Sequence, residues 1–223
     1  MTGRCRRRIG WALLFVTALT VIAGVALLRT PSWWSPVAAE NPAALEAGEN
    51  FENACISESH RVRPENQPWA VRVRDAEVNA WLATRLPKWV EHLGALRPGA
   101  AQVRFTEGTI ELATEIAGLP SIASLRIAPV VANGAISLGR QRVAVGRFPL
   151  PVAHSLVIAP LVRSLGGSDA PDELQLAIAL LGGQAIKAEF ELADGRVVRV
   201  RDIEVHDGEM LLEFETAPPA RRR

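Results

Sequence analysis

Side chains of the types that catalyse reactions or bind metals are few in this chain and lie far apart. The 223 residues include four histidines, and none lies in an H-x-H or H-E-x-x-H motif or beside a second cysteine, the spacings that hold zinc or iron. No G-x-S-x-G or S-x-x-K motif marks a nucleophilic serine. His154 and Ser155 are adjacent, so on a helix their side chains face apart. We therefore expect no catalytic residue, no metal site and no cofactor.

Carboxylates offer one other route to catalysis. Asp202, Glu204 and Asp207 lie on an expected strand and its turn, where a solvated face is the usual explanation. A pair of carboxylates of the kind that glycosidases use keeps a hydrolase as the third of three hypotheses.

The distribution of charge argues against nucleic acid as a partner. The net charge is +1, but eight of the 25 basic residues lie at the two ends of the chain. Residues 30–220 keep 17 basic against 24 acidic side chains, which gives this body a charge near −7. A nucleic-acid-binding domain needs a concentrated basic face, so we exclude that class.

The first 35 residues carry the strongest pattern. Residues 11–28 contain no charged side chain, and a helix of this length spans about 27 Å, close to the hydrocarbon thickness of a bilayer. Four arginines precede the run and one, Arg29, follows it at once, which predicts a cytoplasmic N-terminus. Aromatic side chains flank it as they do at membrane interfaces. We therefore predict a transmembrane signal-anchor helix with these membrane-interface residues: Trp11, Trp33, Trp34, Arg6, Arg7 and Arg8.

A cleaved signal peptide is the alternative, because Val37-Ala38-Ala39 resembles a cleavage site. The apolar run is long for a signal peptide and ends far from Ala39, so we favour the retained anchor. Either way the main domain is exported, and we expect a chain held in the inner (cytoplasmic) membrane with this domain in the periplasm or outside the cell. Cys5 and Cys55 then lie on opposite sides of the membrane. Cys55 is a buried small hydrophobe, an exposed thiol or an intermolecular link.

The predicted organisation has five parts. They are a cytoplasmic basic segment at 1–10, the transmembrane helix at 11–28, a linker at 29–40, an extracytoplasmic α+β domain at 41–216 and a disordered tail at 217–223. Within the domain, Asn41 is expected to cap a helix that begins at Pro42 and continues to about Cys55. Asp75 is expected to cap a second helix, and Pro87 to begin a short third one.

The remaining elements are strands, with one apolar stretch between them. Alternation predicts a strand at 69–74, and Glu-Gly, Asn-Gly and Asp-Gly pairs predict hairpin turns at 107–108, 133–134, 194–195 and 207–208. One strand is expected to run from Leu125 to Val131. The stretch at 152–165 contains Pro160 and predicts a kinked helix or two short ones, and Gly182-Gly183 is expected to end a further helix. The fold class is α+β: a curved antiparallel meander sheet packed on amphipathic helices.

Two short motifs resemble a known group of proteins. Glu77-Val-Asn79-Ala-Trp-Leu82 and Gly146-Arg-Phe-Pro149-Leu150-Pro151 are similar to elements of bacterial single-pass envelope proteins related to the tubular lipid-binding (TULIP-like) superfamily. The resemblance covers residues 69–216. It implies a long curved sheet around a helix, with an apolar cavity for an acyl chain, and it supplies no catalytic residue. Pro160 departs from the pattern, because it interrupts the long helix such cavities use. For Asn79 itself we expect a structural role, a side-chain hydrogen bond that closes the helix against a strand.

These observations leave two leading hypotheses. The first is a membrane-anchored, extracytoplasmic domain that binds or shuttles a lipid or another apolar ligand. The alternative is a non-catalytic envelope scaffold or assembly protein that acts on a protein partner through an exposed apolar patch or sheet edge. A lipid-sized apolar cleft would favour the first, and an open sheet edge the second.

Overall fold

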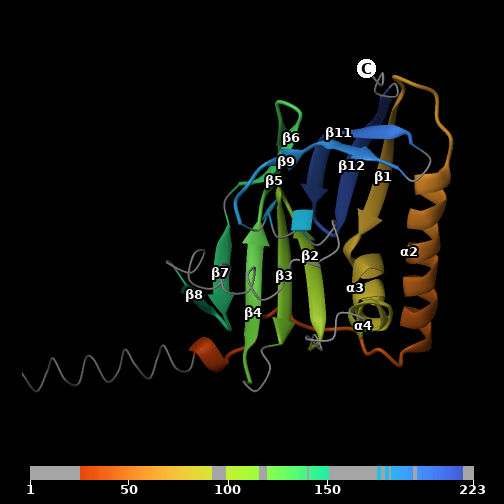
Figure 1. The fold of residues 1–223 in the computed structure, drawn as a ribbon. Coiled ribbons are helices and arrows are strands. Elements are labelled where there is room, and N and C mark those ends of the chain that lie inside the picture. Colours follow the sequence, from red (N-terminus) through yellow and green to blue (C-terminus); the bar gives the residue numbers. More distant parts are fainter. Residues whose placement is uncertain are drawn as a thin grey trace, which may run out of the picture.

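The chain has an α+β fold, and all the strand pairs among its described residues are antiparallel, as the sequence predicts (Figure 1). The prediction of one meander sheet was wrong, because the strands form three sheets and the first strand of the chain pairs with the last. The structure, a computed structural model, describes residues 26–91, 99–115, 120–139, 141–150, 175–176, 179–180, 182–192 and 195–217. Most of the predicted span at 11–28, all of 152–165 and the tail from 218 lie outside these residues. Among the described residues, no helix combines the length and apolar character needed to cross a bilayer.

The helices begin close to where the sequence places them. Helix α2 spans Pro42–His60, and the side chain of Asn41 accepts a hydrogen bond from the Ala43 N–H (3.0 Å), which confirms the predicted cap. The helix ends at His60, five residues later than expected. Helix α3 spans Asp75–Thr84, so the prediction that Asp75 is the cap was wrong by one residue. Arg74 takes that position, and its N–H donates to the carboxylate of Glu77 (3.1 Å). Helix α4 spans Leu86–Glu91.

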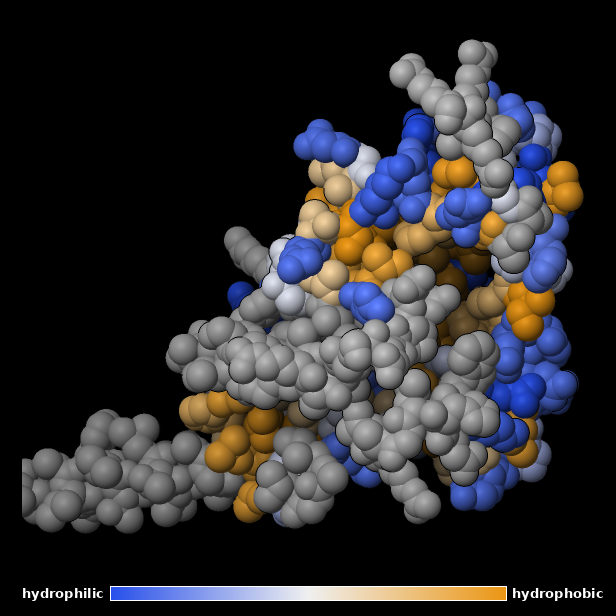
Figure 2. All heavy atoms as spheres, viewed as in Figure 1, coloured by the Kyte–Doolittle hydropathy of each residue, from blue (hydrophilic) through white to orange (hydrophobic). Residues whose placement is uncertain are grey.

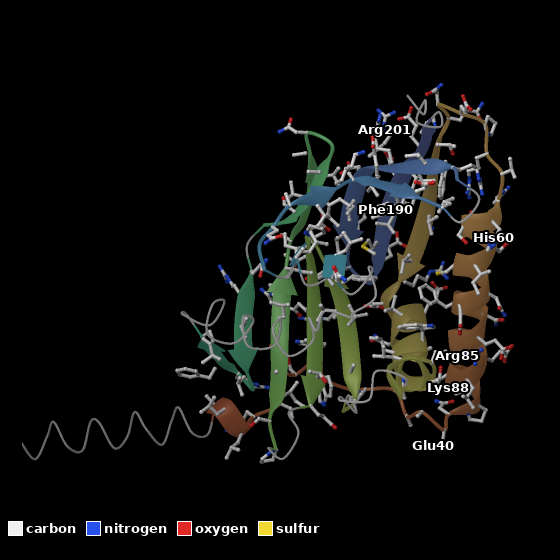
Figure 3. All side chains as sticks on the ribbon, viewed as in Figure 1. Glu40, His60, Arg85, Lys88, Phe190 and Arg201 are labelled. Carbon is white, nitrogen blue, oxygen red and sulfur yellow. The ribbon has the colours of Figure 1, made fainter. Side chains whose placement is uncertain are left out.

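The first sheet has four strands in the order β1-β12-β11-β10, with bounds Pro68–Arg74, Glu209–Ala217, Val197–His206 and Glu189–Glu191. Its register places charged side chains on one face of the sheet and apolar side chains on the other. The outer face is charged and carries ion pairs such as Arg201 with Glu215 (3.0 Å; Figure 3). The inner face carries Trp69, Val71, Val73, Val198, Val200, Ile203, Val205, Met210, Leu212 and Phe214.

The second sheet has the order β2-β3-β4-β7-β8, with bounds Ala101–Thr106, Thr109–Glu115, Ile122–Ile127, Arg142–Val145 and Phe148–Leu150. A third, small sheet is formed by β5 (Pro129–Ala132), β6 (Ala135–Leu138) and β9 (Ile186–Lys187). The predicted single strand from Leu125 to Val131 is therefore wrong, because it divides between two sheets. The division falls at Pro129, whose missing N–H cannot continue a ladder. The expected hairpins at Glu107-Gly108, Asn133-Gly134 and Asp207-Gly208 are confirmed.

The first two sheets meet end to end through their hairpin turns. The Gly108 N–H donates to the Val205 carbonyl (2.8 Å), and the Gly208 N–H donates to the Phe105 carbonyl (3.2 Å). A buried cluster of Val73, Val103, Phe105 and Val205 lies at this junction, with Val78 and Leu82 of α3 packed against it. The core thus lies between the inner faces of the sheets and the helices.

Asn79 joins α3 to β2. Its side chain accepts from the Val103 N–H (2.7 Å) and donates to the Val103 carbonyl (2.8 Å), and all of these groups are buried. This confirms the expected structural role of Asn79. The end of α3 is also tied to α2, because Arg85 pairs with Glu52 (2.9 Å; Figure 3).

Helices α2 and α3 pack closely at Gly48. This residue is buried, and a Cβ there would lie 3.0 Å from the Ala80 carbonyl oxygen and closer still to the Thr84 hydroxyl. Sequence alone marks Gly48 as a weak point in the helix, but the structure shows that it permits this contact.

Replacing Gly48 by alanine should therefore destabilise the domain by about 1–3 kcal/mol, even though alanine favours an exposed helix by about 1 kcal/mol over glycine. Urea unfolding of the full-length chain, followed by tryptophan fluorescence, measures the change. Combining Gly48→Ala with Thr84→Ala should restore part of the loss, because it removes the nearer obstacle. An alanine variant as stable as the parent would contradict the close packing.

Candidate binding groove

A groove of about 900 Å³ separates α2 from β1. One wall is the face of α2 that carries Ala47, Asn50, Phe51 and Ala54, and the other is the whole length of β1 from Pro68 to Val73. Helix α2 stands beside β1 at one side of the molecule (Figure 1). Most of the side chains on the α2 wall are small, which leaves space next to the strand.

The groove leads into an apolar cleft of about 290 Å³ over the inner face of the four-stranded sheet. Every second residue along each strand faces the floor of the cleft, as the register requires. The apolar residues that line the cleft are Val71, Val73, Phe190, Leu192, Val198, Leu212 and Phe214. Figure 2 shows hydrophobic side chains recessed in a hollow beside α2, between hydrophilic rims. The volume is at the lower end of the range of about 300–1,000 Å³ for small-molecule sites.

Trp69 lies where the groove meets the cleft and lines both. Its ring stacks on Phe214 with centroids 4.5 Å apart, and the guanidinium of Arg63 lies 3.5 Å from the ring centroid. The indole N–H is buried, and no described residue accepts a hydrogen bond from it. A buried donor without a partner costs about 1–3 kcal/mol.

Three arginines collect where α2 ends. Arg61 pairs with Glu58 (3.4 Å), Arg63 also pairs with Glu58, and Arg196 donates to the carbonyls of Arg61 (2.7 Å) and Ser59 (3.2 Å). His60 marks this end of the helix in Figure 3. The guanidinium groups satisfy carbonyls at the C-terminus of the helix and offset its negative dipole end. In the described part of the chain, Arg61 and Arg63 share the single carboxylate of Glu58, so this end of the groove carries a positive excess.

Cys55 lies at the rim of both the groove and the cleft. Its side chain is exposed, so the interpretation of Cys55 as a buried small hydrophobe was wrong. Partial desolvation, followed by the negative charge of Glu77, raises the pKa of the thiol above its ordinary value. The thiol is therefore mostly protonated at neutral pH and is a weak nucleophile.

The predicted membrane-interface residues fall into two groups. Trp11, Arg6, Arg7 and Arg8 lie outside the described residues. Trp33 and Trp34 are half-buried in a segment that runs along the second sheet: the Trp33 carbonyl accepts from the side chain of Gln102 (3.2 Å), and the Arg104 guanidinium lies 5.0 Å from the Trp33 ring centroid. Part of the predicted linker therefore contacts the domain, and the interface role of these tryptophans stays a prediction.

The three carboxylates on which the hydrolase hypothesis depends do not line the groove. Asp202, Glu204 and Asp207 are exposed, as expected of a solvated face. No three metal-ligating side chains come together in the described part of the chain. One buried carboxylate was not predicted from the sequence: Glu111 pairs with Arg104 (2.9 Å) and with Arg126. The three residues stand in register across β2, β3 and β4. The register of the predicted hairpins could have indicated this ladder.

Comparison of the chain with protein-family models, with curated proteins and with solved structures finds no match.

Proposed function

We propose that this protein is a membrane-anchored, extracytoplasmic domain that holds a lipid or another apolar ligand in the cleft between α2 and the four-stranded sheet. The observation that carries the proposal is the apolar cleft itself, open to a larger groove through which a chain could enter. Each methylene group buried there would contribute about 0.8 kcal/mol to binding. The positive excess around Arg61 and Arg63 would suit an anionic or zwitterionic head group at the entrance.

The membrane part of this proposal depends on the sequence. The uncharged run at 11–28, its flanking arginines and its tryptophans support a single-pass anchor in the inner membrane, with the N-terminus in the cytoplasm. The structure places residues 26–30 against the domain, because the Arg147 N–H donates to the Ala26 carbonyl (2.9 Å) and the Ser121 hydroxyl donates to the Leu27 carbonyl (3.0 Å). An anchor that continues from these residues would tether the domain to the bilayer, where apolar ligands are available.

The resemblance to TULIP-like envelope proteins implies the same function; its first motif lies in α3, and residues 146–150 of its second motif lie in the β7–β8 hairpin. We further propose that the sheet is curved and wraps around the apolar ligand.

The alternative, a scaffold that acts through protein contacts, is favoured by a different observation. Among the described strands, β1 lies at the edge of its sheet, and its residues from Pro68 to Val73 line the groove. Exposed edges are sites where other chains pair.

Native mass spectrometry of the full-length chain, released from detergent, tests the proposal. We expect a species heavier than the chain by the mass of a lipid or fatty acid, retained through detergent exchange. The outcome that would contradict the proposal is a mass equal to that of the chain alone, together with no uptake of added phospholipid or fatty acid.

A further inference from the structure

Strand β1 presents unpaired backbone groups to the groove. It is the outer strand of its sheet and pairs with β12 alone among the described strands. The Asp75 N–H donates to the Gly208 carbonyl (3.0 Å), directly across the ladder. In an antiparallel pair, hydrogen-bonded positions alternate, so Trp69, Val71 and Val73 bond β12 while Ala70 and Arg72 turn their N–H and C=O groups away from it. Both of these residues line the groove.

Neither end residue of β1 has a free backbone N–H, which limits the part of the strand that another strand could pair with. Pro68 has no N–H, and the Arg74 N–H is occupied by the Glu77 carboxylate. Two N–H and two C=O groups, those of Ala70 and Arg72, are therefore left for an added strand. No described residue bonds them. An extended peptide paired with β1 could form four backbone hydrogen bonds there, which is the mode of recognition by strand addition.

The side-chain environment fixes which peptide fits. Peptide residues opposite Val73, Val71 and Trp69 would turn their side chains to the inner face, toward α2 and the apolar cleft. Residues opposite Arg72 and Ala70 would point to the outer face and to solvent. The peptide should thus have apolar side chains at every second position, three in all.

Charge fixes the direction of the peptide. Arg61 and Arg63 lie at the end of the groove near Pro68, and Glu77 lies at the other end near Arg74. A free carboxylate is attracted to the two arginines and an N-terminal or basic group to Glu77. The peptide chain would then run antiparallel to β1, with its C-terminus at the arginines.

From these observations we infer that the groove between α2 and β1 binds the extended C-terminal segment of a partner protein as an added strand. This interaction surface goes beyond the proposed binding of an apolar ligand, because its backbone hydrogen bonds come from the edge of β1, while the side chains of the peptide would meet the cleft.

The test uses the full-length chain in lipid nanodiscs and a displayed library of random heptapeptides with free C-terminal carboxylates. We expect enriched peptides to have apolar residues at alternate positions at the C-terminal end. The consensus peptide is then synthesised with a free carboxylate and as the amide. The amide should bind about tenfold more weakly, since it loses a charge-assisted contact.

Two pairs of variants test whether the peptide pairs with the edge of β1. Ala70→Pro and Arg72→Pro each remove one N–H that points into the groove and should weaken peptide binding about tenfold or more. Their matched controls, Ala70→Ser and Arg72→Ala, keep the N–H and should bind like the parent. Proline is tolerated at such edge positions, and an unchanged melting temperature checks the fold of each variant.

Three outcomes would overturn the inference. The first is no enrichment of any peptide over empty nanodiscs. The second is equal binding by Ala70→Pro and Ala70→Ser, or binding that depends on the cleft residue Leu212 but not on Ala70. The third is a dimer of the chain that Ala70→Pro converts to a monomer, which would assign the edge to a second copy. Retention of a lipid is measured separately, so either proposal can fail while the other stands.

Discussion

Replacing Leu212 by aspartate is expected to remove the bound lipid from the full-length chain. Leu212 lies on the inner face of β12 and lines the apolar cleft, where it pairs across the ladder with Val71. A carboxylate there would need to lose water when a ligand enters, and its partners across the ladder, Val71 and Ile203, carry no charge that would offset this loss. We expect the fraction of chain that retains a lipid adduct in native mass spectrometry to fall at least tenfold, which corresponds to about 1.4 kcal/mol or more.

The neighbouring residue supplies the control. Leu211 is on the same strand but faces the charged outer side, opposite Arg72 and Glu204. Leu211→Asp should keep the adduct, although it makes the same chemical change one residue away. Circular dichroism of both variants checks that the fold is kept. Equal loss of lipid in the two variants, or loss in neither, would place the lipid outside the cleft.

The largest effect on stability is expected at Asn79. Asn79→Ala would leave the N–H and C=O of Val103 buried without partners, and each such group costs about 1–3 kcal/mol. The sum predicts a loss of about 2–6 kcal/mol. In a chain of this size that lowers the melting temperature by roughly 4–24 °C. Differential scanning fluorimetry of the full-length chain measures it directly.

Asn53→Ala is the matched control for this prediction. Asn53 is exposed on α2, so the same substitution removes no buried bond and should leave the melting temperature within about a degree or raise it slightly. A small shift for both variants would mean that the link between α3 and β2 is not essential to the domain.

Local chemistry explains why much of the fold could be predicted. Asn41 and Pro42 begin α2 because a side-chain cap and a fixed φ angle act within a few residues. The Asn133-Gly134 turn forms because both residues adopt positive φ angles there, 52° and 72°. The Gly182-Gly183 helix stop is confirmed as well: Gly183 has φ 83°, its N–H donates to the Leu180 carbonyl, and the Gln184 N–H donates to the Ala179 carbonyl.

Non-local pairing explains what could not be predicted. Strand β1 pairs with β12, which lies about 140 residues further along the chain. No local signal joins these two strands, so the groove between β1 and α2 was not foreseen. For the same reason, no local signal shows that the expected strand is divided at Pro129 between two sheets. For Gly48, sequence shows a weakened helix, and only the position of α3 shows a reason for the glycine.

The central claim is that a lipid occupies the cleft, and site-specific photocrosslinking tests it most directly. A photoreactive benzoyl-phenylalanine would replace Phe214, which lines the cleft, or Glu213, which faces the outer side of the same strand. The full-length chain would be irradiated in bacterial membranes and analysed by mass spectrometry. The account predicts lipid adducts at position 214 and none at position 213. Equal adducts at both positions, or no lipid adduct at position 214, would contradict it.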